Sequence, residues 1–265
     1  MKLYDLWIPD HVASIAKQLI QKGFKCYLVG GAVRDAFRSY YSGLQAQSEE
    51  DIIEYNPKDH DLAFNGTKKD LAKLELDGFT IVNTGLQYGT SKAVEITTGE
   101  EVDVAIFRKD FDYDGRRPSL VTEAKTIDED LARRDFRMNA IAIDLETKEI
   151  IDPFDGKKDI EKRIISTMQD PEECLKQDAL RIIRAIRFQA VLGLTIDGDL
   201  IEAALTEQSQ ISLSNLSHER IRDELVKILS KTKSGDDVWA AFEHLYTVKV
   251  FTTRGVDGEF QIVAR

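Results

Sequence analysis

The chain has 265 residues and carries 47 acidic side chains against 36 lysines and arginines, a formal net charge of −11 at pH 7. This acidic excess argues against a protein that coats nucleic acid over most of its surface, although it leaves room for a local basic cleft. Hydrophobic residues make up 42% of the chain and prolines number five, which is typical of a folded protein with a sizeable core and little disorder.

The first predicted element is a helix over residues 10–22, with Asp10 as its N-cap and Gly23 as its stop. The run KCYLVGG then predicts a short strand that ends in two glycines, and AVRDAFRSYY predicts a helix. A strand, a glycine turn and a helix in this order can present backbone N–H groups to an anion. The polar, acid-rich residues 45–58 predict an exposed loop or an insertion.

The next segments alternate in the manner of strands. DHDLAF and FTIVNT predict strands on either side of a short helix, and KAVEITT and EEVDVAIF predict two more strands joined by a hairpin turn. From about residue 120 the pattern becomes helical. One long helix is predicted over DPEECLKQDALRIIRAIRFQAVLGL, and three more follow before the end. We therefore expect an α+β protein, with a small mixed sheet and flanking helices first and an all-helical part second.

The cysteines and the apolar stretches bear on the cellular compartment in which the protein is expected. Cys26 and Cys174 show no CxxC spacing, which argues against a disulfide framework or a zinc site and favours a reducing compartment. Neither the first nine residues nor any later stretch resembles a signal peptide or the ~20 apolar residues of a membrane span. We expect a cytoplasmic protein that makes no use of a membrane.

Three carboxylates are candidates for metal binding. Asp59 and Asp61 are two residues apart in KDHDLAF, so on a strand both would project from the same face. Asp103 sits in the alternating strand EEVDVAIF. Each acid alone is more simply an exposed residue at a strand. Together, convergent carboxylates can hold two Mg²⁺ ions, which prefer hard oxygen ligands.

Two groups of residues are suited to bind phosphate. The string LVGGAVRD offers a Gly-Gly turn and Arg34, but it matches neither GxGxxG nor GxxxxGK[ST], so it is neither a dinucleotide-binding nor a P-loop motif. In LARRDFRMNA, Arg133, Arg134 and Arg137 form a local basic group in an acidic protein. Such a group favours a polyanionic substrate. The alternative for these arginines is a solvated helix face.

A third group lies on the predicted helix QDALRIIRAIRF. Helical spacing puts Asp178, Arg181 and Arg184 on one stripe, and it puts Arg187 at the border of the apolar face, shielded and aimed at a buried anion. Asp178 and Arg181 could form a simple ion pair across one helical turn. They could also present an acceptor and a donor as a fixed edge to a nucleobase.

Taken in order, these motifs resemble the class II tRNA nucleotidyltransferases, or CCA-adding enzymes, and the bacterial poly(A) polymerases related to them. The resemblance extends over about residues 24–230, with a weaker echo in HERIRDELVKIL. It implies a nucleotidyltransferase head over residues 1–150 and a helical neck with a shortened body over residues 151–265. It also implies that CTP and ATP supply C, C and A to the 3′ end of tRNA, with Mg²⁺ as cofactor.

The resemblance implies a role for each candidate residue. The metal pair falls on Asp59 and Asp61, and the third catalytic carboxylate falls on Asp103. Asp178 and Arg181 correspond to the residues that template the incoming base. The full set of implied nucleotide-binding residues is Gly30, Gly31, Arg34, Arg134, Asn139, Asp178, Arg181, Arg184 and Arg187.

The sequence departs from the family pattern at several points. Gln177 stands where an acid is common, Arg137 replaces the threonine of RRDFT, and the link before DHD is longer than usual. Relatives usually continue into a tail that grips tRNA, beyond the part that corresponds to this chain. The segment 108–130 corresponds to a loop that helps the switch from C to A, which favours complete CCA addition over a CC-only product.

Two alternatives stay open at this stage: a poly(A) polymerase that makes long A tails from ATP alone, and a non-catalytic RNA- or nucleotide-binding remnant. The grip on RNA, a homo-oligomeric state and the role of residues 45–58 also stay open.

Overall fold

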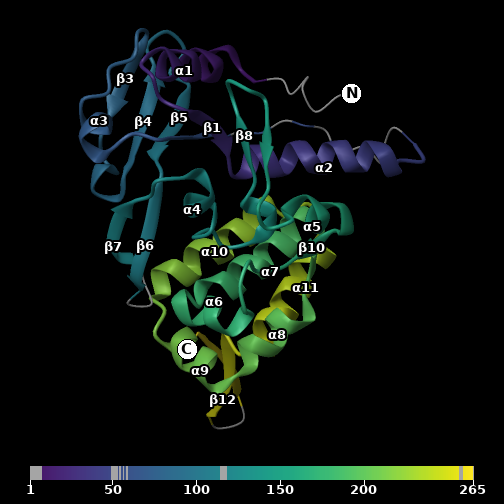
Figure 1. Cartoon of the computed structure of the whole chain (residues 1–265). Coiled ribbons are helices and arrows are strands. Elements are labelled where there is room, and N and C mark those ends of the chain that lie inside the picture. The colour runs from purple at the N-terminus through teal and green to yellow at the C-terminus, as the bar shows by residue number, and fades with distance from the viewer. Residues whose placement is uncertain are drawn as a thin grey trace. The chain divides into compact units, whose positions relative to one another are not determined.

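The structure is a computed structural model, and it describes residues 8–48, 53, 55, 57, 59–113, 118–256 and 259–264. The chain forms two compact units. The first, here called the sheet unit, comprises Met1–Phe111 and Leu120–Glu161, and the second, the helical unit, comprises Asp112–Ser119 and Lys162–Arg265. Figure 1 shows strands concentrated in the first and helices in the second, so the predicted α+β class is confirmed. The domain boundary at residue 150 stays a prediction.

The sheet unit is built on a seven-stranded mixed sheet with the order β3-β4-β5-β2-β1-β8-β9. β1 pairs antiparallel with both β2 and β8, whereas β2 pairs parallel with β5. The predicted mixed sheet is therefore present. Its strands are β1 (Cys26–Val29), β2 (Asp61–Phe64), β3 (Phe79–Val82), β4 (Thr90–Glu95), β5 (Glu101–Ile106), β8 (Ala142–Asp144) and β9 (Ile150–Ile151).

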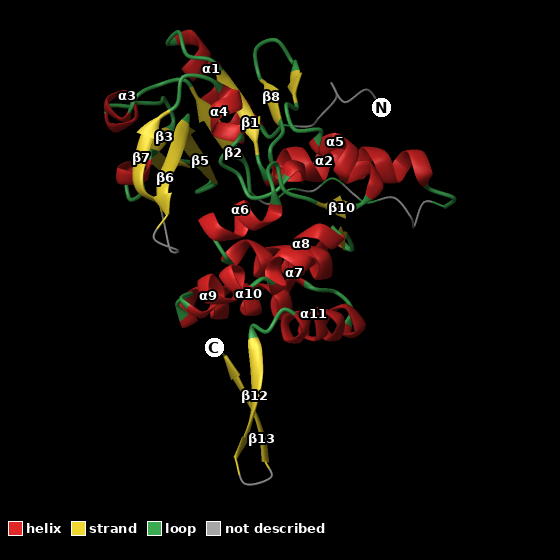
Figure 2. Cartoon of the chain, turned by 60° about the horizontal axis from the view of Figure 1, so that its bottom comes forward, coloured by secondary structure: helices red, strands yellow, loops and turns green. Residues whose placement is uncertain are grey.

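Helices, 3₁₀ turns and part of a hairpin complete this unit (Figure 2); residues 112–119 of the hairpin segment are grouped with the helical unit. The predicted first helix is present, but its N-cap is Pro9 and Asp10 is already helical. Likewise Thr126, not Asp128, caps the helix of the DEDLARRD segment, because its side chain accepts from the N–H of Glu129. The elements are α1 (Asp10–Gln21), α2 (Gly31–Gln45), α3 (Lys68–Ala72), α4 (Ile127–Leu131), α5 (Gly156–Lys162), the 3₁₀ turns η3 (Leu86–Tyr88) and η4 (Arg137–Asn139), and the hairpin β6 (Arg108–Tyr113) and β7 (Pro118–Glu123).

The core of the sheet unit fixes the strand from which the glycine turn starts. All four residues of β1 are buried, and Leu28 is fully buried next to Leu62 of β2, its register partner. The apolar face of α1, including Ile15 and Leu19, is buried as its spacing predicts. Each such side chain contributes about 1.5–3 kcal/mol by leaving water. The glycine turn after β1 therefore starts from a fixed strand.

The helical unit is arranged around α7, whose Ile182, Ile183 and Ile186 are fully buried. The second half is mainly helical, as predicted, but it also contains short strands that the prediction did not include. The run from residue 251 forms a hairpin, and the sequence between its two strands contains Asp-Gly, a strong hairpin signal. No helix among the described residues has the length and apolar character needed to cross a membrane. The elements are α6 (Pro171–Gln177), α7 (Leu180–Leu192), α8 (Gly198–Leu205), α9 (Glu207–Ser214), α10 (His218–Lys231), α11 (Gly235–Thr247), β10 (Ile164–Ile165), β11 (Thr195–Ile196), β12 (Phe251–Val256) and β13 (Glu259–Ala264).

The long helix predicted to end at Gly193 is interrupted. α6 ends at Gln177, and Asp178 has an extended backbone with φ −149° and ψ 101°. The Asp178 carboxylate accepts a hydrogen bond from the N–H of Leu180 at 3.0 Å, which starts α7. Short polar side chains compete in this way with the helical backbone, so one aspartate converts a single predicted helix into two.

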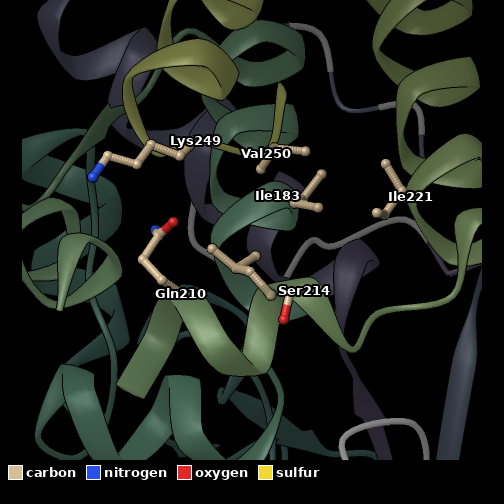
Figure 3. Close-up of a pocket in the computed structure, with 7 residues that line it drawn as sticks. Ile183, Gln210, Ser214, Ile221, Lys249 and Val250 are labelled. Atoms are coloured by element: carbon tan, nitrogen blue, oxygen red, sulfur yellow. The ribbon is translucent and has the colours of Figure 1, made fainter. Parts of the chain in front are cut away.

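Figure 3 shows a pocket in the helical unit that contains none of the predicted site residues. Its walls are mainly apolar, and its polar atoms come from three side chains at the margin. The residues that line it are Ile183, Gln210, Leu213, Ser214, Ile221, Lys249 and Val250.

Candidate active site

Two of the three predicted carboxylates face each other across neighbouring strands. Asp61 begins β2, and the parallel register pairs it with Asp103 of β5. On its other side Asp61 is opposite Val29, the last residue of β1, so the glycine turn starts next to the carboxylate. Adjacent strands lie about 4.8 Å apart. The sheet therefore brings together residues that are more than forty positions apart in the sequence.

The residues just before β2 alternate as predicted. Asp59 is exposed, His60 is buried and Asp61 is partly buried, and the carbonyl of His60 accepts from the N–H of Asp103 at 3.3 Å. Burial raises the pKa of Asp61, the charge of Arg134 opposes this shift, and Asp103 and Asp59 add to it. Three carboxylates thus share a small region in which a further positive charge would be stabilised.

The glycine turn lies against this carboxylate. Gly30 has φ +77° and ψ −139°, a conformation that other residues rarely adopt. A Cβ atom at this position would lie 2.7 Å from Oδ2 of Asp61 and 3.4 Å from Nη1 of Arg134. Glycine is therefore needed both for the turn and for the close approach of backbone, carboxylate and guanidinium.

Arg34 and Asn139, which the sequence suggested separately, are in direct contact. Arg34 lies in the first turns of α2, is 9% exposed, and donates from Nη1 to Oδ1 of Asn139 at 2.9 Å. It also donates to both oxygens of Asp35, and Asn139 donates to Asp135 at 2.9 Å. This network fixes the guanidinium of Arg34 near the N-terminus of α2.

The sequence analysis missed Asp130, which holds the predicted arginine cluster. Its carboxylate is 1% exposed and accepts from Arg133 at 2.9 and 3.0 Å, from Arg134 at 3.2 Å and from the N–H of Arg108 at 3.2 Å. Burial raises the pKa of Asp130, but the two guanidinium groups and the hydrogen bonds outweigh burial and lower it overall. The available signal was an acid three and four residues before two arginines.

Arg134 is the arginine of this cluster that reaches the carboxylates. Its Nη1 approaches Gly30, and its charge acts on Asp61. Its Nε is buried and finds no hydrogen-bond acceptor within the described part of the chain. A buried donor without an acceptor is costly, which sets Arg134 apart as a candidate for a polar partner outside the described residues.

The carboxylates fit a hard divalent cation that shares its ligands with substrate. Among the described residues, no three His, Cys, Asp or Glu side chains are grouped closely enough to hold a metal by themselves. Mg²⁺ is usually bound by one or two carboxylates, with waters and substrate phosphates completing its octahedron. Asp61 and Asp103, paired across β2 and β5, are two carboxylates of the kind that could take this part. Lys92, whose Nζ lies 3.9 Å from Asp103, partly offsets their charge.

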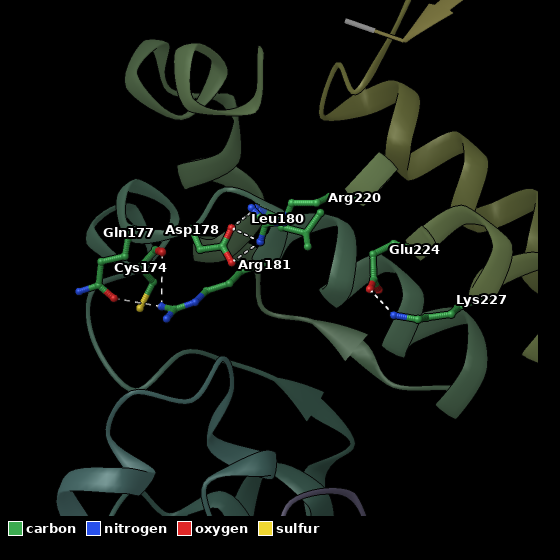
Figure 4. Close-up of polar contacts among 8 residues, drawn as sticks. All are labelled: Cys174, Gln177, Asp178, Leu180, Arg181, Arg220, Glu224 and Lys227. Atoms are coloured by element: carbon green, nitrogen blue, oxygen red, sulfur yellow. Dashed lines mark hydrogen bonds and ion pairs between the residues drawn. The ribbon is translucent and has the colours of Figure 1, made fainter. Parts of the chain in front are cut away.

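The other predicted residues lie in the helical unit, where Asp178 and Arg181 have different partners. Asp178 forms an ion pair with Arg220 of α10 at 2.8 Å, and Nη1 of Arg181 donates to the side chain of Gln177 at 3.3 Å (Figure 4). The predicted continuous stripe on one helix is broken, because Asp178 lies before α7 with an extended backbone; Arg181 is only 5% exposed. Arg184, the third residue of that stripe, is half-buried on α7.

Arg187 is shielded and aimed at a buried anion, as predicted. That anion is Glu224 of α10, 6% exposed, with 2.5 Å between Nε and Oε2. Arg187 also lies 3.9 Å over the ring of Phe188, and Lys227 donates to the same glutamate at 2.8 Å. These contacts give Arg187 a structural task between α7 and α10, and its implied place in a nucleotide pocket stays a prediction.

Glu224→Gln is expected to destabilise the protein by about 3–5 kcal/mol at neutral pH, because it leaves the buried charge of Arg187 unpaired. Burial raises the pKa of Glu224, but Arg187 and Lys227 outweigh burial and lower it. A lowered folded-state pKa contributes stability above the ordinary value of 4.5, and this contribution is lost as the pH falls below that value. Urea unfolding at several pH values, followed by circular dichroism, measures both effects.

Asp223→Asn is the matched control for this variant. Asp223 is the preceding residue of α10, but its side chain is 60% exposed and pairs with exposed Arg222. Surface pairs of this kind contribute about 0–1 kcal/mol. Equal unfolding free energies for the two variants would contradict the assigned role of Glu224.

Sequence comparisons match both parts of the chain to known families. The family described as "Poly A polymerase head domain" matches residues 26–166, and "Probable RNA and SrmB- binding site of polymerase A" matches residues 193–252. Proteins named CCA-adding enzyme from two Staphylococcus aureus strains, MRSA252 and Mu3, are each 37% identical over 243 residues. These alignments cover 91% of this chain and 54% of each relative, so the chain spans about half the length of the curated relatives it matches.

Solved structures agree. The crystal structure of the Bacillus stearothermophilus CCA-adding enzyme in complex with CTP has a TM-score of 0.70 and 32% identity, covering 88% of this chain and 50% of that one. The Thermotoga maritima CCA-adding enzyme complexed with tRNA_CCA has a TM-score of 0.65 and 23% identity, covering 96% and 56%. The second likeness shows a shared fold.

Proposed function

Because the chain belongs to the poly(A) polymerase head-domain family of nucleotidyltransferases, which includes the CCA-adding enzymes it resembles, we propose that it adds C, C and A to the 3′ end of tRNA from CTP and ATP. The observation that carries this proposal is the pairing of Asp61 with Asp103 beside the Gly30 turn and Arg134. A region that combines acids, a backbone turn and a guanidinium supports the proposal that a metal-bound triphosphate binds there.

In the proposed reaction the terminal 3′-oxygen of the RNA attacks the α-phosphorus of the nucleotide. A new O–P bond forms, the bond between the α- and β-phosphates breaks, the hydroxyl proton is released, and pyrophosphate leaves. Such catalysis depends mainly on positioning and on neutralisation of charge. The residues of the chain can be assigned to these tasks.

Divalent metal ions are general to this family, and we assign Mg²⁺ to Asp59 and Asp61, with Asp103 as the third carboxylate; when bound, the ion lowers the pKa of the attacking hydroxyl and neutralises phosphate charge. The Gly30–Gly31 turn presents backbone N–H groups at the start of α2, where the helix dipole favours an anion. Arg34 and Arg134 donate to phosphate oxygens, and Asn139 orients Arg34.

Base selection is assigned to the helical unit. Asp178 can accept from the exocyclic amino group of cytosine or adenine, and Arg181 can donate to a ring nitrogen beside it. Uracil and guanine present a carbonyl oxygen where the amino group would be, which an ionised carboxylate repels. Replacing either residue with alanine is expected to blur the choice of nucleotide and to leave metal binding unchanged.

The test is incubation of purified protein with tRNA that lacks CCA, with CTP, ATP or both, and separation of products at single-nucleotide resolution. Three additions that then stop, and that need both nucleotides, are expected. A ladder of A residues from ATP alone would instead identify a poly(A) polymerase, the alternative that the name of the matched head family favours. No addition under any condition would contradict both activities and support a non-catalytic remnant. Cytoplasmic location and a homo-oligomeric state stay predictions.

A further inference from the structure

Asp178 and Arg181, the two proposed base-selecting residues, lie where α6 gives way to α7. The side chain of each forms hydrogen bonds with other residues and not with the side chain of the other member of the pair. Nη2 of Arg220, on α10, donates to both oxygens of Asp178 at 3.1 and 2.8 Å, and the N–H of Leu180 donates to Oδ1 at 3.0 Å (Figure 4). Nη1 of Arg181 donates instead to Gln177 at 3.3 Å and to the carbonyl of Cys174 at 3.4 Å. The carboxylate and the guanidinium are thus each fixed by separate contacts.

This separation has a chemical consequence. An aspartate and an arginine three residues apart attract each other. In a direct ion pair the guanidinium would occupy the carboxylate oxygens, and neither group would be left to contact a base. A carboxylate has roughly four lone-pair sites, more than the hydrogen bonds from Leu180 and Arg220 occupy, so Asp178 can still accept from a base amino group.

The position of Arg220 is itself well defined. One helical turn further along α10, Glu224 is buried and paired with Arg187 of α7 and with Lys227. The side chains of Arg220 and Asp178 are 20% and 18% exposed, so their ion pair is only partly screened by water. Two ion pairs thus position α10. The pair of Glu224 with Arg187 joins it to α7, and the pair of Arg220 with Asp178 joins it to the segment between α6 and α7.

We propose that Arg220 is a positioning residue for nucleotide selection, which acts by fixing the carboxylate of Asp178 in place as an acceptor that is kept apart from Arg181. This inference rests on the proposed function, because it takes Asp178 to be the group that reads the base. Its consequence is that loss of Arg220 lowers the preference for amino-bearing bases, cytosine and adenine, over uracil and guanine, without removing the carboxylate itself.

The first experiment compares Arg220→Gln with Arg222→Gln. Arg222 is on the same helix, but its side chain is 69% exposed and pairs with exposed Asp223. Equilibrium binding of CTP, ATP, UTP and GTP to the full chain is measured with Mg²⁺ and without RNA. Arg220→Gln is expected to reduce the preference for CTP and ATP by about tenfold, the effect of losing one well-placed base contact, and Arg222→Gln is expected to change nothing.

A second comparison shows whether Arg220 acts through Asp178. In an Asp178→Asn background, Arg220→Gln should lower the preference much less than it does alone, because residues that act together are not additive. Additive losses, or full preference in Arg220→Gln, would overturn the inference. If Arg220→Gln fails to fold by circular dichroism, Arg220→Lys replaces it, with an intermediate preference expected and an unchanged one contradicting the proposal.

Nucleotide binding and nucleotide addition are measured separately, so failure of this inference can be distinguished from failure of the proposed function. Wild-type protein that prefers CTP and ATP in binding but adds no nucleotide to RNA would contradict the function and leave the role of Arg220 testable by the same binding assay. Wild-type protein that adds CCA while Arg220→Gln keeps full preference would contradict only the role of Arg220. Equal binding of all four nucleotides by the wild type would overturn the inference directly.

Discussion

Asp61→Asn is expected to lower the rate of nucleotide addition by at least about 10³-fold, since catalysis by metal-assisted charge neutralisation contributes several kcal/mol and each ~1.4 kcal/mol is a factor of ten. Asparagine keeps the shape of the side chain but removes the charge from the carboxylate that faces Asp103 and the Gly30 turn. Single-turnover extension of tRNA lacking its terminal nucleotides, at saturating CTP, measures the chemical step.

Glu101→Gln is the matched control. Glu101 lies two residues before Asp103 on β5, so it projects from the same face, and like Asp103 it is near Lys92, at 2.7 Å. Its side chain is 55% exposed. Loss of a carboxylate there should leave the rate within a few-fold of wild type. A rate for Asp61→Asn equal to that of Glu101→Gln would show that the metal pair has been assigned to the wrong residues.

Local patterns predicted much of the fold, because burial imposes them residue by residue. The four-residue strand β1 follows from a short β-rich run that ends in two glycines, and the buried apolar face of α1 follows from helical spacing. The break at Asp178 did not follow, since the segment has helical periodicity throughout and contains neither proline nor glycine there. Only the hydrogen bonds that Asp178 forms with Leu180 and Arg220 make the extended backbone favourable at that point.

Some residues of the candidate site were likewise predictable from local sequence, and others were not. Motifs identified the residues whose chemistry is visible in the sequence, such as Asp59, Asp61 and Arg134. They did not identify Asp130 or Arg220, which matter because Asp130 accepts a hydrogen bond from Arg134 and Arg220 donates one to Asp178. Asp178 and Arg220 are 42 positions apart, so no local pattern relates them. The resemblance to a known family adds the order of the motifs along the chain to what single motifs indicate. Only the tertiary structure shows which side chain orients another.

Gly30→Ala is expected to lower the rate of nucleotide addition by about 10²-fold, the cost of misplacing a reacting group by about 1 Å. The new Cβ would lie 2.7 Å from Oδ2 of Asp61, so the carboxylate must turn away from its place opposite Asp103. Because the atom displaced is the end of a side chain, the main effect falls on geometry at the site. The rate and the melting temperature are measured on the same preparation.

Gly99→Ala separates geometry from backbone strain. Gly99 has φ +78°, within one degree of the +77° of Gly30, but nothing lies within 4 Å of the position where its Cβ would be. Both variants place alanine at a positive φ, but the ψ of −139° at Gly30 lies in a region that glycine alone adopts readily, and only Gly30→Ala also displaces Asp61. We therefore expect a smaller loss of stability and a normal rate in Gly99→Ala. Equal rates in the two variants would show that the close approach of Gly30 to Asp61 has no part in catalysis.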